Sequence, residues 1–118
     1  DIAMGTDMGF EPGFGTNAHE LEVYVDLGMS PMDALLTATR NAANAIGVGK
    51  QLGTLEKGKL ADVLVIDGNP LENIKVLQDR EKMQMVMKEG IIYIDRRPGS
   101  PRKEIMTAKP DSWAKIDA

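Results

Sequence analysis

The sequence predicts an α/β fold in which a short strand and two helices come before a further set of strands. Positions 17–47 carry helix-start residues and apolar residues at helical spacing. Positions 60–95 carry short runs of β-branched and apolar residues bounded by glycine, proline and asparagine. The composition changes between these stretches, after residue 49. We therefore expect three parts: residues 1–49, residues 50–95 and a polar tail over residues 96–118.

The composition argues against several classes of protein. The 118 residues are 42% hydrophobic and 27% charged, as in a soluble globular domain. The net charge of −4 argues against nucleic acid as a partner, because phosphate binding needs a basic face. No apolar run approaches the roughly 18 residues of a membrane span, and we expect no membrane partner. The chain has no cysteine, which removes disulfides and thiolate metal sites and favours a cytoplasmic protein.

The first element is expected over Asp1–Asp7, a short segment that we interpret as a buried strand. A glycine-rich stretch, Gly9–Gly15, follows it. This stretch lacks the lysine and hydroxyl of a phosphate-binding loop, so we interpret it as an active-site loop whose glycines permit tight turns. Phe10 and Phe14 either line a pocket there or pin the loop.

The first helix is predicted to follow Asn17. Asn17 as the N-cap and Glu20 three residues later form the pattern of a capping box, so we interpret Glu20 as a cap rather than a catalyst. Gly28 suits the left-handed residue that ends a helix. Leu21, Tyr24, Val25 and Gly28 are expected to fall on one side of this helix.

The second helix has three start signals, with Ser30 as the N-cap, Pro31 at the first helical position and Asp33 at the third. Gly47 is expected to end it. Its many alanines indicate close packing against a neighbouring backbone. The residues expected on the buried side are Met32, Leu35, Leu36, Thr39, Ala42, Ala43 and Ile46.

Strands are predicted for the rest of the ordered chain. Leu60–Asp67 reads as one strand, and Leu71–Gln78 as a short helical or irregular crossing. Met83–Asp95 is predicted to form a hairpin that turns at Glu89-Gly90. Residues 96–118 are polar and are expected to form a solvated tail.

Six blocks of this sequence resemble a known family when they are taken in order. The blocks are Gly5–Asp7, Asn17–Leu21, Leu27–Leu35, Ala38–Ala43, Leu52–Val63 and Lys88–Tyr93. The ordered set resembles the amidohydrolase superfamily, in its imidazolonepropionase-like and Xaa-Pro-dipeptidase-like branch, over about residues 1–95. The resemblance implies that the chain holds the last strand and helices of a TIM-barrel amidohydrolase, followed by part of a small β-sandwich.

Asp7 is the candidate catalytic residue and the candidate metal ligand. Barrel enzymes place such groups at the C-terminal ends of strands, and Asp7 ends a predicted strand beside a glycine-rich loop. The resemblance implies that Asp7 ligates one metal ion and accepts the proton of the metal-bound water. The alternative is a loop-capping aspartate that accepts hydrogen bonds from local amides. The whole ordered set favours the catalytic role.

The resemblance also implies a divalent metal, with zinc as the first choice and one or two ions. The chain holds a single histidine, His19, so most of the ligands are expected upstream of these residues. We interpret His19 as an exposed helix residue. Asp62 is interpreted as a carboxylate bonded to turn amides or to Arg40 rather than as a ligand. Many members of this branch have a histidine where this chain has Phe14, so no substrate-binding residue is assigned.

These expectations lead to one function and one rival. The parent protein would hydrolyse a C–N bond in an amide, a cyclic amide or a small peptide, while the 118-residue chain alone would be inactive. The rival is a catalytically inactive truncated module that serves as an interaction or structural domain. Because the neighbouring strands of the barrel and sandwich would be missing, we expect the chain to associate with itself or with the upstream half of its parent.

Overall fold

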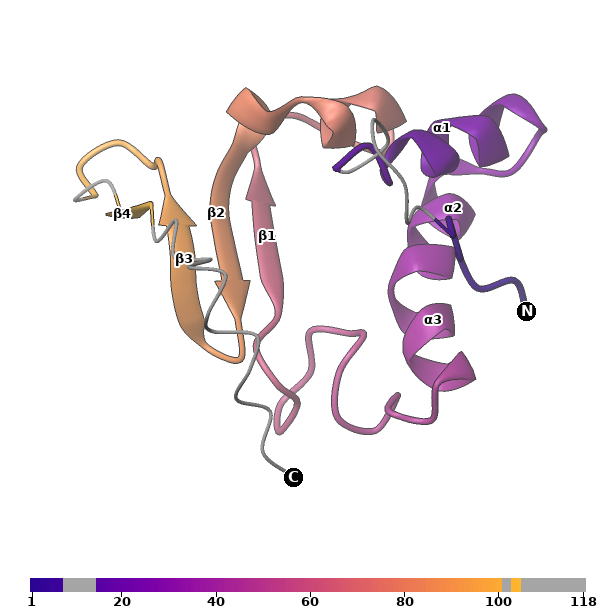
Figure 1. The fold of residues 1–118 in the computed structure, drawn as a ribbon, viewed down its shortest axis with the longest axis horizontal. Helices are drawn as coiled ribbons and strands as arrows, with labels where there is room; N and C mark the ends of the chain where they lie inside the picture. Colours follow the sequence, from indigo (N-terminus) through magenta and orange to yellow (C-terminus); the bar gives the residue numbers. More distant parts are fainter. Residues whose placement is uncertain (8–14, 101–102, 105–118) are drawn as a thin grey trace.

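The computed structural model describes residues 1–7, 15–100 and 103–104 (Figure 1). Helices and strands both occur, so the expected α/β class is confirmed. The helices are α1 (His19–Asp26), α2 (Pro31–Ala38) and α3 (Arg40–Ala45), and the 3₁₀ helices are η1 (Ile74–Gln78) and η2 (Arg80–Lys82). The strands are β1 (Val63–Ile66), β2 (Met83–Lys88), β3 (Ile91–Asp95) and β4 (Lys103–Glu104).

The helices α1–α3 and the sheet β1–β4 lie on opposite sides of the molecule (Figure 1). The 3₁₀ helices η1 and η2 join the two sides at one end, and the connection over residues 46–62 joins them at the other. The contact between α1 and η1 ties the helical side to this junction. None of the helices in the described part of the chain is long and apolar enough to cross a membrane.

The predicted strand over residues 1–7 is wrong for the described structure. The Met4 N–H donates to the Thr37 carbonyl at 2.9 Å, and Asn41 Nδ2 donates to the Ile2 carbonyl at 3.0 Å. Both partners belong to helices. A strand forms where a second strand pairs with its N–H and C=O groups, and no described strand lies beside this segment. Ile2 is 58% exposed, so the segment is not buried either.

Helix α1 begins without the predicted capping box. Ala18 occupies the N-cap position, and no side chain caps the helix. The Asn17 main-chain carbonyl accepts from the Glu20 N–H at 3.1 Å, while the Glu20 carboxylate accepts from the Tyr24 hydroxyl. The Tyr24 hydroxyl is therefore bonded to the Glu20 carboxylate, which a capping box would need as an acceptor for the Asn17 N–H. The predicted helix end is confirmed, since Gly28 has a φ of +102°.

Helix α2 begins as predicted. Ser30 Oγ accepts from the Asp33 N–H at 3.1 Å and donates to the Asp33 carboxylate at 2.6 Å. Pro31 occupies the first turn, where its missing N–H removes no helical hydrogen bond. The helix does not run unbroken to its predicted end, because the backbone departs from helical geometry at Thr39 (φ −123°, ψ −98°) and α3 starts afresh.

The buried faces of α2 and α3 differ in part from the predicted one. Ala43 is buried as predicted, and Ala34 and Thr37 are buried as well. Met32 and Ile46, which were expected inside, are 50% and 75% exposed. The break between the two helices interrupts the helical register, so one periodic pattern does not describe both.

One apolar cluster connects the helices to η1. Leu21, Ala34 and Ile74 are buried together at its centre. The partly buried residues packed around them are Met4, Tyr24, Val25, Met29, Leu35 and Leu77. A second close approach lies at α3, where a Cβ on Gly53 would stand 2.5 Å from the Ala43 Cβ. The predicted packing of a backbone against the alanine-rich helix is therefore confirmed.

The sheet confirms the predicted strand and hairpin. Its strands pair antiparallel in the order β1-β2-β3-β4. Glu89 and Gly90 have φ values of +52° and +80°, as the two-residue turn of a hairpin requires. The Glu89 N–H donates to Asp62 Oδ1 at 2.8 Å, and the Gly90 N–H donates to the Ala61 carbonyl at 3.0 Å. The predicted role of Asp62 as an acceptor for turn amides is confirmed.

The predicted polar tail is wrong for residues 103–104, which pair as β4, whereas residues 97–99 are exposed as predicted. Asp95 is only 4% exposed. Its carboxylate accepts two bonds from the Arg97 guanidinium, at 2.8 and 2.7 Å, and one from the Ser100 hydroxyl at 2.6 Å. These bonds hold the pKa of Asp95 well below its usual range. The polar residues thus form a turn around a buried carboxylate, after which β4 pairs with β3.

Candidate functional site

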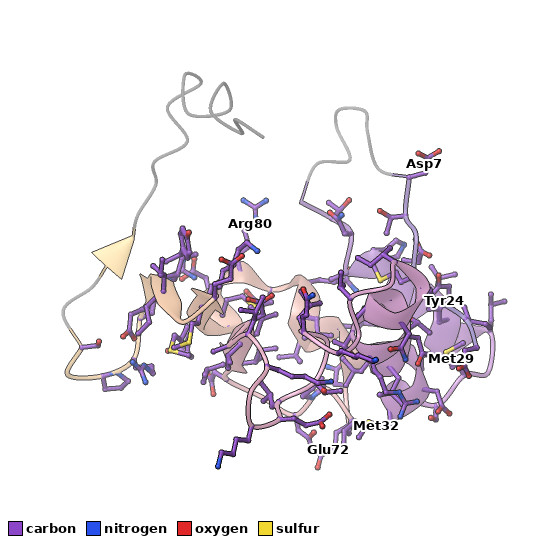
Figure 2. All side chains as sticks on the ribbon, turned by 90° about the horizontal axis from the view of Figure 1, so that it is seen from below. Asp7, Tyr24, Met29, Met32, Glu72 and Arg80 are labelled. Atoms are coloured by element: carbon purple, nitrogen blue, oxygen red, sulfur yellow. The ribbon has the colours of Figure 1, made fainter. Side chains whose placement is uncertain are left out.

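Asp7 ends the first described segment, at the rim of the helical side (Figure 2). The residue is exposed, and its backbone φ is +48°. This left-handed conformation is uncommon for residues other than glycine, although aspartate tolerates it better than most. Among the described residues other than glycine, only Asp7 and Glu89 have a positive φ, and Glu89 is explained by its hairpin turn. The unusual backbone singles out Asp7 as a candidate functional position.

A cavity of about 400 Å³ lies beside the segment that Asp7 ends. The residues that line it are Thr6, Thr16, Asn17, His19, Glu20, Val23 and Tyr24. Within it the Tyr24 hydroxyl donates to the Glu20 carboxylate, and this bond raises the pKa of Tyr24. Asp7 is not one of the described lining residues, so the cavity adjoins the candidate catalytic group without containing it.

Glu22 connects α1 to η1 through a polar network. Its carboxylate accepts from Gln78 Nε2 and from Lys75 Nζ, each at 2.6 Å, and it lies 3.1 Å from His19 Nδ1. The bond from Gln78, followed by that from Lys75, lowers the pKa of Glu22 to about 2. The His19 side chain is 61% exposed, which confirms its prediction as an exposed helix residue. The network fixes the start of α1, which forms one wall of the cavity.

The described residues do not form a complete metal site. In residues 1–7, 15–100 and 103–104, no group of three or more His, Cys, Asp and Glu side chains could hold an ion. The side chains of His19 and Asp62 have other partners, and Asp7 stays the ligand that the resemblance in sequence implies. One carboxylate is a single ligand, whereas zinc takes four. Phe10 and Phe14 of the predicted active-site loop lie outside the described residues.

The comparison with protein families decides the class of this chain. Residues 1–92 match the amidohydrolase family, and this match includes Asp7 and the elements from α1 to β2. The chain belongs to the amidohydrolase family. Amidohydrolases generally use divalent metal ions. The resemblance seen in the ordered blocks of sequence is therefore confirmed.

Individual relatives agree with this assignment. Ochratoxinase of Aspergillus niger is 42% identical over 94 residues, which are 78% of this chain and 19% of that protein. Imidazolonepropionase of Symbiobacterium thermophilum is 33% identical over 99 residues, 80% of this chain and 23% of that protein. The crystal structure of a Xaa-Pro dipeptidase with bound methionine in the active site has a TM-score of 0.72 and 40% identity, covering 79% of this amidohydrolase chain and 22% of that one. The chain thus spans about a fifth of the length of these relatives.

Two polar features of this amidohydrolase have no counterpart among the sequence predictions. Gln78 lies 56 positions from Glu22, so no local pattern indicates their contact. Asp95, Arg97 and Ser100 lie within five positions of one another, and the opposite charges at Asp95 and Arg97 are a signal from which that turn could have been predicted.

Proposed function

We propose that the full-length protein containing this chain is a metal-dependent hydrolase that acts on the C–N bond of an amide, a cyclic amide or a small peptide. The observation that carries the proposal is the amidohydrolase match over residues 1–92, which includes the candidate base Asp7. The names of the relatives support it, since a dipeptidase cleaves the C–N bond of a dipeptide. The whole protein is the subject of the proposal, because the chain covers about a fifth of those relatives.

In this proposal Asp7 is the general base and one ligand of a divalent metal, zinc in the first place, with one or two ions. An exposed carboxylate can take a proton from the attacking water and return it to the leaving nitrogen. The bound metal would supply Lewis acidity to the site. The other ligands would come from outside these 118 residues, because the described residues supply no cluster of ligands.

The proposal also accounts for a first segment that lies beside no described strand. In the full-length protein, residues 1–7 would pair as the last strand of a TIM barrel, with α1–α3 beside it. The sheet β1–β4 would then belong to a small β-sandwich next to the barrel. Support comes from the TM-score of 0.72 with the Xaa-Pro dipeptidase and from residues 1–7, which have no described strand as a neighbour.

The test compares the full-length wild-type protein with Asp7→Asn on a panel of Xaa-Pro dipeptides, other dipeptides, N-acyl amino acids and cyclic amides. The variant keeps the shape of the side chain but cannot act as a base, so hydrolysis should fall by about 10²-fold or more. Metal content is measured in both proteins by mass spectrometry. Asp62→Asn is the matched control, because Asp62 accepts a turn amide and should affect the rate little.

Two results would contradict the proposal. Near-normal turnover in Asp7→Asn with unchanged metal content would remove Asp7 from its role. No hydrolysis of any panel member by a metal-loaded, folded wild-type protein would instead favour the inactive module. The isolated 118-residue chain should bind zinc weakly and hydrolyse nothing, and stoichiometric tight zinc in that chain would show that its own residues complete a site.

A further inference from the structure

The cavity of about 400 Å³ beside α1 lies one residue away from the candidate base. Thr6 lines this cavity and is bonded covalently to Asp7, so the two Cα atoms are about 3.8 Å apart. Figure 2 shows Asp7 and Tyr24, a further lining residue, on the helical side of the molecule. The volume is in the usual range for a site that takes a small molecule. The cavity is therefore placed to hold the part of a substrate that lies next to the reacting bond.

The described lining of this cavity contains an acid but no lysine or arginine. Glu20 is the one acidic side chain among those lining residues. His19 lines the cavity as well, but its Nδ1 lies 3.1 Å from the carboxylate of Glu22, which is not among the described lining residues. A carboxylate makes strong, charge-assisted hydrogen bonds to a cationic donor. The lining therefore favours a ligand that brings its own positive charge.

The two acidic residues in the first turn of α1 have different partners. Glu22 accepts from Gln78 and Lys75, each at 2.6 Å, and so joins α1 to η1. Glu20 does not cap the helix, because no side chain bonds its first N–H groups. Among the described residues, the side chain that bonds the Glu20 carboxylate is Tyr24, whose hydroxyl donates to Oε1. The second carboxylate oxygen, Oε2, remains an acceptor for a ligand.

Tyr24 holds the Glu20 carboxylate in place. The Tyr24 side chain is partly buried and packs against the apolar cluster around Leu21, so its hydroxyl is fixed from the core side. The bond to Glu20 raises the pKa of Tyr24, and the phenol therefore keeps its proton as a donor to the carboxylate. The phenol oxygen can still accept a hydrogen bond. Glu20 Oε2 and the Tyr24 oxygen thus form a pair of acceptors on adjacent turns of one helix.

We propose that Glu20 binds the ammonium group of an aminoacyl substrate, so that peptides with a free amino terminus are the substrate class of the proposed hydrolase. The inference rests on the proposed function, since it takes Asp7 as the base. In such a peptide one Cα atom separates the ammonium from the carbonyl carbon that water attacks. The single residue step from the cavity to Asp7 suits this short spacing. An N-acyl amino acid has no ammonium at this position and would leave the carboxylate without its cation, which costs affinity.

The experiment uses the full-length protein and a matched pair of substrates, a dipeptide of the panel and the same dipeptide with an acetylated amino terminus. The wild type should have a kcat/KM at least about 10-fold higher for the free dipeptide. Glu20→Gln should raise KM for the free dipeptide by about 10-fold to 100-fold, as the loss of a hydrogen bond to a charged group does, with kcat within about twofold. The same variant should leave both constants for the acetylated dipeptide unchanged.

Two further variants separate this role from a general effect. Tyr24→Phe should raise KM for the free dipeptide by a smaller factor than Glu20→Gln, because the carboxylate remains but is no longer held. Asp26→Asn is the matched control: it removes one carboxylate from an exposed position of α1 that is not among the described lining residues, and KM should stay near the wild-type value. The melting temperature of Glu20→Gln should equal that of the wild type, since the amide oxygen still accepts from Tyr24.

Several results would overturn the inference. These are equal kcat/KM values of the wild type for the two dipeptides, a rise in KM that Glu20→Gln causes for both, and an equal rise in Asp26→Asn. Hydrolysis of N-acyl amino acids or cyclic amides but of no free peptide would also overturn it, while the proposed function stands. If the wild type hydrolyses nothing, the proposed function fails, and titration calorimetry with the two dipeptides still tests the ammonium site. Weaker binding of the free dipeptide to Glu20→Gln than to the wild type would then support the site, whereas equal affinity or no binding would refute it.

Discussion

The helical side and the sheet side of this amidohydrolase chain are stabilised over different distances along the sequence. Each strand of the sheet pairs with the next strand, and β2 and β3 are joined by a two-residue turn. Helix α1 is instead held by Ile74, which packs on Leu21, and by Gln78, which lies 56 positions from its partner Glu22. The sheet is therefore held by hydrogen bonds between strands that follow one another in the sequence, whereas the placement of α1 depends on its contacts with η1.

The largest expected effect concerns association, because both sides expose apolar side chains. Leu27 and Ile46 are 81% and 75% exposed on the helical side, and Leu64 of β1 is 55% exposed. Among the described strands β1 has a neighbour on one side only. Open strand edges and apolar faces favour self-association. The isolated 118-residue chain should therefore form dimers or larger species in light scattering across a micromolar dilution series.

A matched pair of variants shows which side associates. Leu64→Lys charges the open edge of the sheet, and Leu27→Lys charges the helical side. If the sheet edge is responsible, Leu64→Lys should yield monomers while Leu27→Lys still associates. A wild-type chain that is a compact, cooperatively folding monomer would contradict the prediction and would weaken the assignment of residues 1–7 to a larger barrel.

The next effect concerns the contact between the two sides. Ile74 is 5% exposed, so Ile74→Ala should lower the free energy of unfolding by about 2–5 kcal/mol through lost burial and a residual cavity. Leu71→Ala, at a 45% exposed position before η1, is the control and should cost less than about 1 kcal/mol. Urea denaturation measures both values. Similar costs at the two positions would mean that η1 does not hold the helices in solution.

The Glu22 network predicts a dependence of stability on pH. The pKa of Glu22 is about 2 in the folded chain against an ordinary 4.5, so its bonds stabilise the fold above about pH 5 and are lost as the pH falls toward 2. The melting temperature should decrease between pH 6 and pH 3, and less steeply in Glu22→Gln. Asp95, whose pKa is also lowered, contributes in the same direction to both proteins, so their difference isolates Glu22. Parallel pH profiles would show that the network is absent in solution.

The smallest expected effect lies at the start of α2. Ser30→Ala removes the acceptor of the Asp33 N–H and should cost about 1 kcal/mol, while Ser30→Asn should retain most of the stability because asparagine also caps helices. Leu36→Ala, at a half-buried position, should cost more than Ser30→Ala but less than Ile74→Ala. Equal, negligible losses at Ser30 and Leu36 in urea denaturation would indicate that α2 does not pack as described.

The features that the sequence predicts correctly have local signals. The Glu89-Gly90 turn and the Ser30 cap each depend on two or three adjacent positions, and both are confirmed. The strand over residues 1–7 fails because strand formation needs a partner that no local pattern supplies. The capping box fails because Tyr24, one turn further along α1, engages the carboxylate of Glu20.

The candidate site was predictable only in part, for a related reason. The order of the sequence blocks identifies the family, and the resemblance implies the role of Asp7, but it contains no information on the surroundings of that residue. The left-handed backbone of Asp7 and the bonds that Lys75 and Gln78 donate to Glu22 both depend on three-dimensional packing.

The two-residue turn between β2 and β3 bears on the order in which the chain folds. Hairpins close in about 1–10 μs, whereas contacts between distant residues form more slowly because closing a long loop costs more entropy. The helices are synthesised before the sheet, but α1 cannot dock until Ile74 and Gln78 have emerged. We therefore expect the hairpin to be protected from hydrogen exchange before α1 in pulse-labelled refolding. Within these residues, the segment that carries the candidate base would then be synthesised before the sheet but would reach its final position after it.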